Sequence, residues 1–242
     1  MEEPLHHLFS ESEQYLALLQ GSELDTDLEE SSQLLSAACA EPFLASLHLE
    51  LNKAHPEAGA PYWRVRSWGL SCWQPIYLAL ICVYHLKLVP ENLGKLHQKQ
   101  QQDYVAGYAL PDGKWLSGNH EALVQQTAER LKILFDALQT AHLKQFGGRE
   151  ALYQGLLADQ IMMVMVAAAT PPATLADIQK EYRLWAKHLD LTTDPLNRLN
   201  QGAEEITFLR RSCCLHFRRN DGELCNNCPR ALKSKKGTSC LN

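Results

Sequence analysis

Several motifs of nucleotide-binding and hydrolytic enzymes are missing from this sequence. No G-x-G-x-x-G follows an expected strand and no G-x-x-x-x-G-K-S/T is present, so the chain shows no dinucleotide-binding fold or P-loop of its own. The H-E-x-x-H zinc motif and the G-x-S-x-G nucleophile elbow are also missing. The sequence therefore carries no sign of nucleotide-dependent, zinc-protease or serine-hydrolase chemistry.

Cysteine is scarce, with eight among 242 residues, whereas a disulfide-stapled scaffold exceeds about 8%. The first residues, MEEPLHHLFSESEQ, are acidic and lack the basic start and apolar core of a secretory signal. We therefore expect a cytoplasmic protein. In a reducing cytosol, a tight group of cysteines indicates a metal site or redox centre more often than a disulfide pair.

Lys, Arg, Asp and Glu are absent from residues 67–86. A spanning helix needs about 20 predominantly apolar residues, but the continuous apolar stretch here covers only residues 76–84. We expect a buried core helix, with a membrane-surface element as the alternative. A second apolar stretch, residues 161–169, is too short to span a bilayer.

The net charge of −5 is unevenly divided. Residues 210–242 contain eight Lys or Arg against two Asp or Glu, a net charge of +6, which leaves −11 on the rest of the chain. A basic block of this kind is suited to bind nucleic acid, dock an acidic protein or offset the negative charge of a thiolate-bound metal centre.

Hydrophobic periodicity and helix-stop residues predict a mainly helical (α+β) fold. The expected helices cover residues 7–20, 31–40, 42–54, 72–86 (with Pro75 in the first turn), 119–146, 149–170 and 174–189. Residues 62–68 alternate like a strand. Residues 103–110 and 114–116 flank Pro111-Asp112-Gly113, which predicts a β-hairpin in a small antiparallel sheet. We expect residues 1–205 to form the main domain and residues 206–242 a metal-stabilised C-terminal segment.

Four cysteines form the motif C-C-x10-C-x2-C: Cys213, Cys214, Cys225 and Cys228. Four thiolates within 16 residues enclose a metal centre with little loss of chain entropy, because the loop between the two halves is short. The other cysteines are not expected to belong to the metal site. Cys39, Cys72 and Cys82 lie in apolar helical stretches, where a thiol packs as a small hydrophobe, and Cys240 is expected to be a free thiol.

The spacing favours a two-iron cluster and leaves zinc open. Structural zinc sites use two C-x(2–4)-C knuckles, and only the second half of this motif is one. Side chains of adjacent residues in extended chain point to opposite sides, so the neighbouring pair does not easily chelate one small tetrahedral ion. A vicinal disulfide, a thioredoxin-like site and a Rieske centre fit less well; a Rieske centre needs two histidines, and only His216 is near. We expect a turned backbone at the vicinal pair.

At this motif the sequence resembles the FhuF family of ferric-siderophore reductases, whose four C-terminal cysteines hold an atypical [2Fe-2S] cluster. The resemblance carries over to Cys213, Cys214, Cys225 and Cys228 one by one, and Pro229 fits it too. It implies that residues 206–242 are a [2Fe-2S]-binding segment. It also implies a cytoplasmic oxidoreductase, with peripheral contact to the inner membrane as an alternative, that reduces Fe³⁺ in imported hydroxamate-type siderophores.

The resemblance also sets the expected cofactors and partners. A [2Fe-2S] cluster carries one electron at a time, so we expect no flavin or NAD(P) bound by this chain. Electrons then come from a ferredoxin, a flavodoxin or an NAD(P)H-dependent reductase. Nucleic acid is not an expected partner.

Residues outside the motif are candidates for docking the substrate or the donor. Arginines near the cysteines would raise the reduction potential or bind an acidic donor, unless they are solvated tail charges: Arg210, Arg211, Arg218, Arg219 and Arg230. His216 is a candidate for coupling proton transfer to electron transfer. An aromatic and basic group is a candidate for the siderophore groove, with core packing as the other interpretation: Tyr62, Trp63, Arg64, Arg66, Trp68 and Trp73.

A second class of function fits the same tail. A zinc- or cluster-bearing module would use the basic C-terminal segment to bind nucleic acid or a protein. The tail has few aromatic residues for base stacking, and the chain as a whole is acidic. The reductase hypothesis is therefore favoured.

Overall fold

A computed structural model describes residues 3–24, 34–169, 173–202 and 205–231. The fold is mainly helical with small sheets, as the sequence predicts. The helices are α1 (Pro4–Tyr15), α2 (Ala40–Ala54), α3 (Gly59–Leu80), α4 (His120–Phe146), α5 (Glu150–Ala168) and α6 (Leu175–Leu189). Short 3₁₀ turns cover η2 (Pro56–Ala58), η4 (Leu93–Lys95), η5 (Asp194–Arg198) and η6 (His216–Arg218), and a π-helical turn, η3 (Ile81–Leu86), extends α3.

The strand expected at residues 62–68 is wrong, because these residues belong to α3. Tyr62, Val65 and Trp68 are buried at helical spacing, and a short segment that alternates over a few positions fits both periods. Pro75 lies deep inside α3 and not in a first turn. The helix and its π-helical turn end where Lys87 adopts a left-handed conformation, with φ of 57°.

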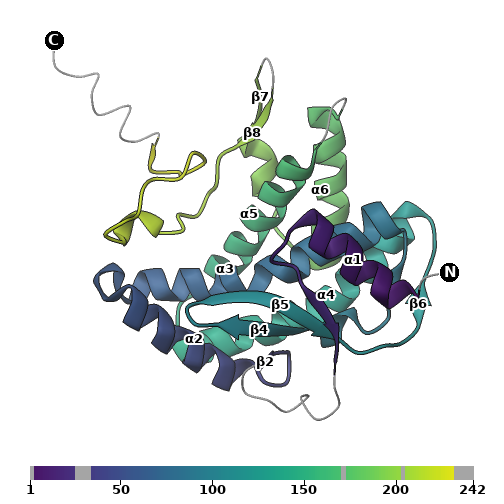
Figure 1. Cartoon of the computed structure of the whole chain (residues 1–242). Coiled ribbons are helices and arrows are strands. Elements are labelled where there is room, and N and C mark those ends of the chain that lie inside the picture. The colour runs from purple at the N-terminus through teal and green to yellow at the C-terminus, as the bar shows by residue number, and fades with distance from the viewer. Residues whose placement is uncertain (1–2, 25–33, 170–172, 203–204, 232–242) are drawn as a thin grey trace.

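The three long helices that follow begin where the sequence predicts. The Asn119 side chain accepts the backbone N–H of Ala122 at the start of α4. Thr174 and Asp177 form a reciprocal capping box at the start of α6. The central helix α5 buries residues on nearly all sides, and it lies against α3 and α6 (Figure 1). It therefore lies at the middle of the molecule, covered by other helices.

The main sheet is mixed, with strand order β1-β5-β4-β2. Its strands are β1 (Gly21–Glu23), β2 (Leu34–Leu35), β4 (His97–Gln101) and β5 (Tyr104–Leu110). β1 runs parallel to β5, and the other pairs are antiparallel. Residues 34–35 were expected to be helical and are instead strand β2; residues 31–33 of that expected helix lie outside the described part of the chain.

A β-hairpin forms in this region, but its turn lies before residues 103–110 and not after them. β5 pairs with β4 across Gln102, whose φ is 56°. The segment after Pro111-Asp112-Gly113 is strand β6 (Trp115–Leu116), which pairs with β3 (Val89–Pro90). The turn chemistry at residues 111–113 therefore changes the chain's direction without joining two partners of one hairpin.

The last strands, β7 (Leu199–Gln201) and β8 (Ile206–Phe208), form an antiparallel pair that precedes the cysteine motif. This pair spans the position 205/206 that the sequence suggests as a domain boundary. β8 contacts α5, so the chain enters the cysteine motif beside the central helix.

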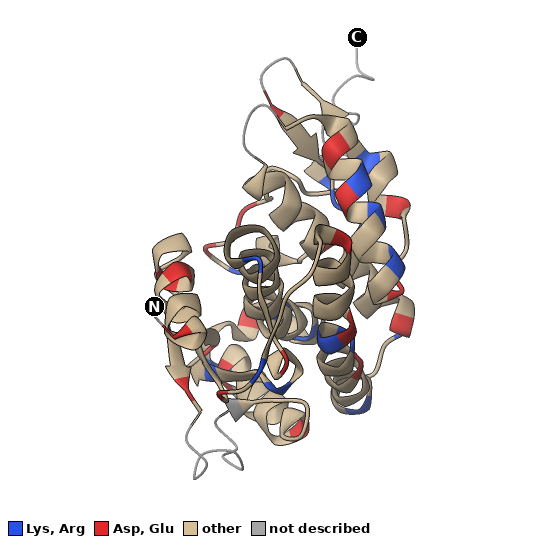
Figure 2. Cartoon of the chain, turned by 90° about the vertical axis from the view of Figure 1, so that its right-hand side faces the viewer, with Lys and Arg blue, Asp and Glu red and all other residues tan. Residues whose placement is uncertain are grey.

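Two helical stretches, Pro56–Leu86 and Glu150–Ala168, have the length and apolar character of membrane spans. Within their most apolar windows, 67% and 50% are buried inside the protein. Core helices of soluble proteins share this character, and the burial is consistent with a soluble protein. In the view of Figure 2, Lys and Arg are interspersed with Asp and Glu along the outer helices, without one basic face.

Candidate metal centre

The cysteines lie on the segment of residues 210–230, called here the cysteine loop. In Figure 1 it is the yellow-green segment near α3 and α5, on the far side of α3 from the main sheet. It contains only one short helical turn, η6 (His216–Arg218). Its position is therefore set by its contacts with the helices.

Asp159 of α5 provides the first anchor of the cysteine loop. Its carboxylate accepts the backbone N–H of Arg211 at 3.2 Å and of Ser212 at 2.7 Å. Asp159 is only 2% exposed, and burial raises its pKa although both backbone bonds oppose that effect. A buried carboxylate thus fixes the two residues that precede the vicinal cysteines.

The turn before α3 provides the second anchor. The Glu57 carboxylate accepts the backbone N–H of Asn220 at 3.0 Å. The Arg218 guanidinium donates to the carbonyl of Ala58 at 3.3 Å. The middle of the cysteine loop is therefore held at η2, while its start is held at α5.

Two backbone hydrogen bonds bring the halves of the motif together. The N–H of Arg210 donates to the carbonyl of Asn227 at 3.1 Å, which joins the vicinal pair to the C-x-x-C turn. The N–H of Cys228 donates to the carbonyl of Cys225 at 2.9 Å and closes that turn. The four thiols consequently lie in one place although the motif is split by ten residues.

The thiols form two pairs. The Sγ atoms of Cys213 and Cys228 are 3.9 Å apart, and those of Cys214 and Cys225 are 3.4 Å apart. None of the four is in a disulfide. Among the residues that the structure describes, no three His, Cys, Asp or Glu side chains converge as the ligands of a single ion. The arrangement therefore consists of two facing pairs and differs from one tetrahedral set.

Arg210 makes the two pairs electrostatically different. Its Nη2 donates to Sγ of Cys214 at 3.2 Å, and the side chain is only 8% exposed. Burial alone would raise the pKa of Cys214, but the Arg210 bond and charge lower it below the usual thiol value. Burial raises the pKa of Cys213 and of Cys225. The thiolate at Cys214 is thus the one that the protein itself stabilises most directly.

The chain turns immediately after the vicinal cysteines. Leu215 adopts a left-handed conformation with φ of 59°, and its N–H points at Sγ of Cys213 at 3.4 Å. This turn lets Cys213 and Cys214 face different partners, Cys228 and Cys225. Adjacent side chains therefore contribute to opposite pairs.

Residues 210–230 match the FhuF 2Fe-2S C-terminal domain. The matched range includes all four cysteines and confirms the resemblance drawn from their spacing. The FhuF 2Fe-2S domain supports a [2Fe-2S] cluster at these cysteines and indicates the siderophore-iron reductase family. The residues fit such a group, because four thiols stand in pairs and Nε of Arg210 is buried without a partner among the described atoms.

The other arginines of the FhuF 2Fe-2S domain contact protein groups. Arg211 pairs with Asp194, Arg219 pairs with Asp221, and the Arg230 guanidinium lies 4.7 Å from the centre of the Phe217 ring. Among the arginines that the structure describes, Arg210 is the one that donates a hydrogen bond to a cysteine sulfur. The expected tail residues 232–242, including Cys240, lie outside it.

The aromatic and basic residues of α3 divide between core and surface groove. Trp68 is 1% exposed and packs against His142 and Tyr153. Trp63 donates its Nε1–H to the carbonyl of His55, and Arg64 lies near Gly148. Arg66 instead lines a groove of about 560 Å³ that also exposes Cys214, Cys225, Arg210 and His216.

Three of the residues expected at a groove, Tyr62, Arg66 and Trp73, do line this one. Gly69 and Tyr77 also line it and were not expected from the sequence. One stripe of α3 lines it: Tyr62, Arg66, Gly69, Trp73 and Tyr77. Their spacing of three or four residues is that of one helix face. Residues 62–68 were interpreted as a strand separate from a helix at residues 72–86, so residues on the two sides of that boundary were not placed on one helix face.

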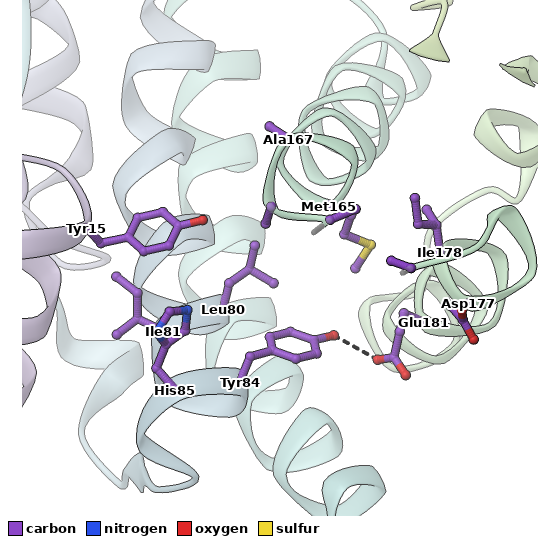
Figure 3. A pocket seen from close by; sticks show the side chains of 13 residues that line it. Tyr15, Leu80, Ile81, Tyr84, His85, Met165, Ala167, Asp177, Ile178 and Glu181 are labelled. Atoms are coloured by element: carbon purple, nitrogen blue, oxygen red, sulfur yellow. Dashed lines mark hydrogen bonds between the residues drawn. The ribbon is translucent and has the colours of Figure 1, made fainter. Parts of the chain in front are cut away.

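A second cavity of about 540 Å³ lies among η3, the end of α5 and the start of α6 (Figure 3). It has no cysteine in its wall. Its two carboxylates already have partners: Glu181 accepts from the hydroxyl of Tyr84 at 2.8 Å, and Asp177 caps α6. Its chemistry is therefore mainly apolar, and the thiol-lined groove is the better candidate for electron transfer.

Proposed function

We propose that this protein transfers one electron to Fe³⁺ in a hydroxamate-type ferric siderophore, so that iron is released as Fe²⁺. The observation that carries the proposal is the position of Cys214 and Cys225. They belong to the FhuF 2Fe-2S domain and also line an aromatic groove. The cysteines that would hold the cluster therefore also line the groove in which the substrate would bind.

We propose that Cys213 and Cys228 bind one iron and that Cys214 and Cys225 bind the other. Thiolates bound about 2.3 Å from one tetrahedral metal ion lie roughly 3.8 Å from each other. The two Sγ–Sγ distances of 3.9 and 3.4 Å are close to that separation. Each pair is therefore spaced as two thiolates on one metal ion, which is what a two-iron group with one pair on each iron requires.

A bound [2Fe-2S] group would supply one electron at a time, which matches the conversion of Fe³⁺ to Fe²⁺. The lower charge weakens the bonds to hard oxygen ligands, so the chelate loosens its iron. The chain needs one electron per turnover from a donor. We propose a ferredoxin, a flavodoxin or an NAD(P)H-dependent reductase for that role, with no flavin or NAD(P) held by this chain.

The chain's own residues would hold and tune the centre. Asp159 and Glu57 fix the cysteine loop on two helical elements. Arg210 stabilises negative charge at Cys214. We place the protein in the cytoplasm, where imported siderophores are reduced, with the exposed arginines Arg211 and Arg230 as candidates for contact with an acidic donor.

Anaerobic purification tests the proposal directly. We expect a coloured protein with two irons and two sulfides per chain and a reduced-state EPR signal. Mixing the reduced protein with a ferric trihydroxamate should bleach that signal and yield one Fe²⁺ per chain, trapped by a ferrous chelator. Cys225→Ser should abolish both, whereas Cys72→Ala, in the helical core, should retain them.

Two results would overturn the proposal. One is a colourless protein that binds a single zinc ion, which would support a zinc-bearing binding module instead. The other is a reduced cluster whose EPR signal is unchanged after ferric trihydroxamate has been added in excess.

A further inference from the structure

We infer that the groove and the second cavity form one two-part site for an amphiphilic metal chelate, with the chelate in the groove and an acyl chain in the second cavity. The presence of a chelate in the groove rests on the proposed function. The new feature is an apolar chain on the ligand, together with the residues that would hold it. Such a chain is separate from the atoms that bind the iron, so it is compatible with any chelating group.

The two cavities follow one another along the same faces of α3 and α5. On α3, Tyr77 lines the groove, and Leu80 and Tyr84 line the second cavity. Their spacing of three and four residues is that of one helix face. On α5, Met163 lines the groove and Ala167, four residues later, lines the second cavity. A ligand that extends beyond the groove along these two helices therefore enters the second cavity.

Tyr15, the last residue of α1, lies where the two cavities meet. Its ring centre is 6.0 Å from that of Tyr77, which lines the groove. The same ring is 5.4 Å from that of His85, and both Tyr15 and His85 line the second cavity. Tyr15 is 36% exposed. The boundary between the cavities thus includes aromatic rings at the protein surface, against which an alkyl chain can pack.

The second cavity has the size and the apolar lining that suit a chain. Its volume of about 540 Å³ falls within the roughly 300–1,000 Å³ of small-molecule sites. Apolar side chains in its wall include Leu80, Ile81, Met165 and Ile178. Figure 3 shows Leu80 and Met165 pointing into this space from α3 and α5. Transfer of alkyl carbon from water into such surroundings is favourable.

The carboxylates of the second cavity have protein partners. Glu181 accepts from the hydroxyl of Tyr84 and lies 2.8 Å from Nε2 of His120, and Tyr84 in turn accepts the Nε1–H of Trp185 at 2.9 Å. Asp177 caps α6. Two carboxylates in the wall disfavour the anionic end of a free fatty acid. The chain would therefore belong to a ligand whose polar part lies elsewhere, and the groove is the adjoining space for that part.

The π-helical turn η3 shapes the wall of the second cavity. Such turns are rare and frequently lie at functional sites. This one places Tyr84 and His85 in the cavity wall, while Cys82 and Val83 are fully buried in the core. An irregular turn at this position is consistent with a wall built for a ligand.

Two gallium chelates that differ only in chain length test the inference. Ga³⁺ has the charge of Fe³⁺ but does not accept an electron under these conditions, so binding is measured apart from reduction. Isothermal titration of the cluster-loaded protein would compare gallium desferrioxamine B acylated at its free amine with either an acetyl or an octanoyl group. Each buried CH₂ group is worth about fourfold in Kd, or ~0.8 kcal/mol. We expect the octanoyl chelate to bind at least about thirtyfold more tightly.

Variants test where the chain lies. Ala167→Leu adds bulk at an exposed position in the wall of the second cavity. It should weaken binding of the octanoyl chelate at least about tenfold and leave the acetyl chelate and the cluster absorption band unchanged. Ala168→Leu, also in that wall, should act in the same way and serves if Ala167→Leu folds poorly. Ala45→Leu places the same bulk on an exposed site of α2 and should change neither affinity.

The outcomes distinguish this inference from the proposed function. Equal binding of the two chelates by the wild type, or no binding of either, would overturn the two-part site even if ferric chelates are reduced. An octanoyl preference that persists in both Ala167→Leu and Ala168→Leu would overturn the second cavity as the place of the chain. An octanoyl preference that these variants remove, without any reduction of the ferric forms, would uphold the two-part site and overturn the proposed function.

Discussion

The carboxylate of Asp159 accepts the backbone N–H of Ser212 at 2.7 Å, directly before the vicinal cysteines. The two residues are 53 positions apart, and their bond ties the cysteine loop to the central helix α5. A loop with one short helical turn gains its fixed position from contacts of this kind.

Asp159→Ala should therefore release the start of the cysteine loop. The N–H groups of Arg211 and Ser212 would lose their acceptor, at about 1–3 kcal/mol for each group that stays buried. We expect faster loss of iron to a chelator and a lower free energy of unfolding, both measurable by absorption and urea titration. Asp136→Ala removes an exposed carboxylate paired with Lys132 and should change neither; an equal effect would contradict the anchor.

Arg210→Gln should lower the reduction potential of the centre. The substitution removes a charged donor from Cys214, and one charge-assisted hydrogen bond corresponds to a shift on the order of 60 mV for one electron. Arg210→Lys keeps the charge and should shift the potential less. An EPR-monitored redox titration measures both variants.

Arg211→Gln is the matched control for Arg210, since Arg211 is exposed and bound to Asp194. Its potential should stay near that of the wild type. If Arg211→Gln shifts the potential as much as Arg210→Gln, the effect comes from total charge and the hydrogen bond to Cys214 is not its cause.

Gly222→Ala should distort the cysteine loop. A Cβ atom on Gly222 would lie 2.0 Å from the carbonyl oxygen of His216, so the backbone between η6 and Cys225 has to move. We expect at least about a twofold loss of bound iron, because misplaced thiols bind metal less well, with unchanged helical circular dichroism. Gly69→Ala has open space and should retain full iron content; normal iron content in Gly222→Ala would refute the prediction.

His142 should make stability depend on pH. Its ring is fully buried, Nδ1–H donates to the carbonyl of Leu138, and burial lowers its pKa from 6.5 to about 4. The unfolded state binds more protons between these two values. Stability should thus be constant above about pH 6.5 and fall by up to roughly 3 kcal/mol as the pH decreases to about 4.

Urea unfolding at about pH 7.5 and pH 5 measures this dependence. His142→Gln has no titrating ring and should show a smaller loss of stability on acidification than the wild type. His6→Gln, at an exposed ring, should behave like the wild type. The same pH dependence in all three proteins would show that His142 does not cause it.

Local sequence signals determined where two of the helices begin and which domain the four cysteines belong to. The capping residues Asn119 and Thr174 fixed where α4 and α6 begin, because a cap bonds to backbone groups within three residues. The cysteine spacing was sufficient to indicate the FhuF 2Fe-2S domain, since the motif lies within one short segment.

Tertiary structure decided the rest. Residues 62–68 became helix because α3 packs its buried face against neighbouring helices, and a seven-residue pattern does not distinguish the two periods. The same packing turned Tyr62, Arg66, Gly69, Trp73 and Tyr77 into one wall beside Cys214 and Cys225. Sequence supplied the thiols and their spacing. Only folding could supply their anchor at Asp159 and the groove beside them, because those contacts join residues more than fifty positions apart.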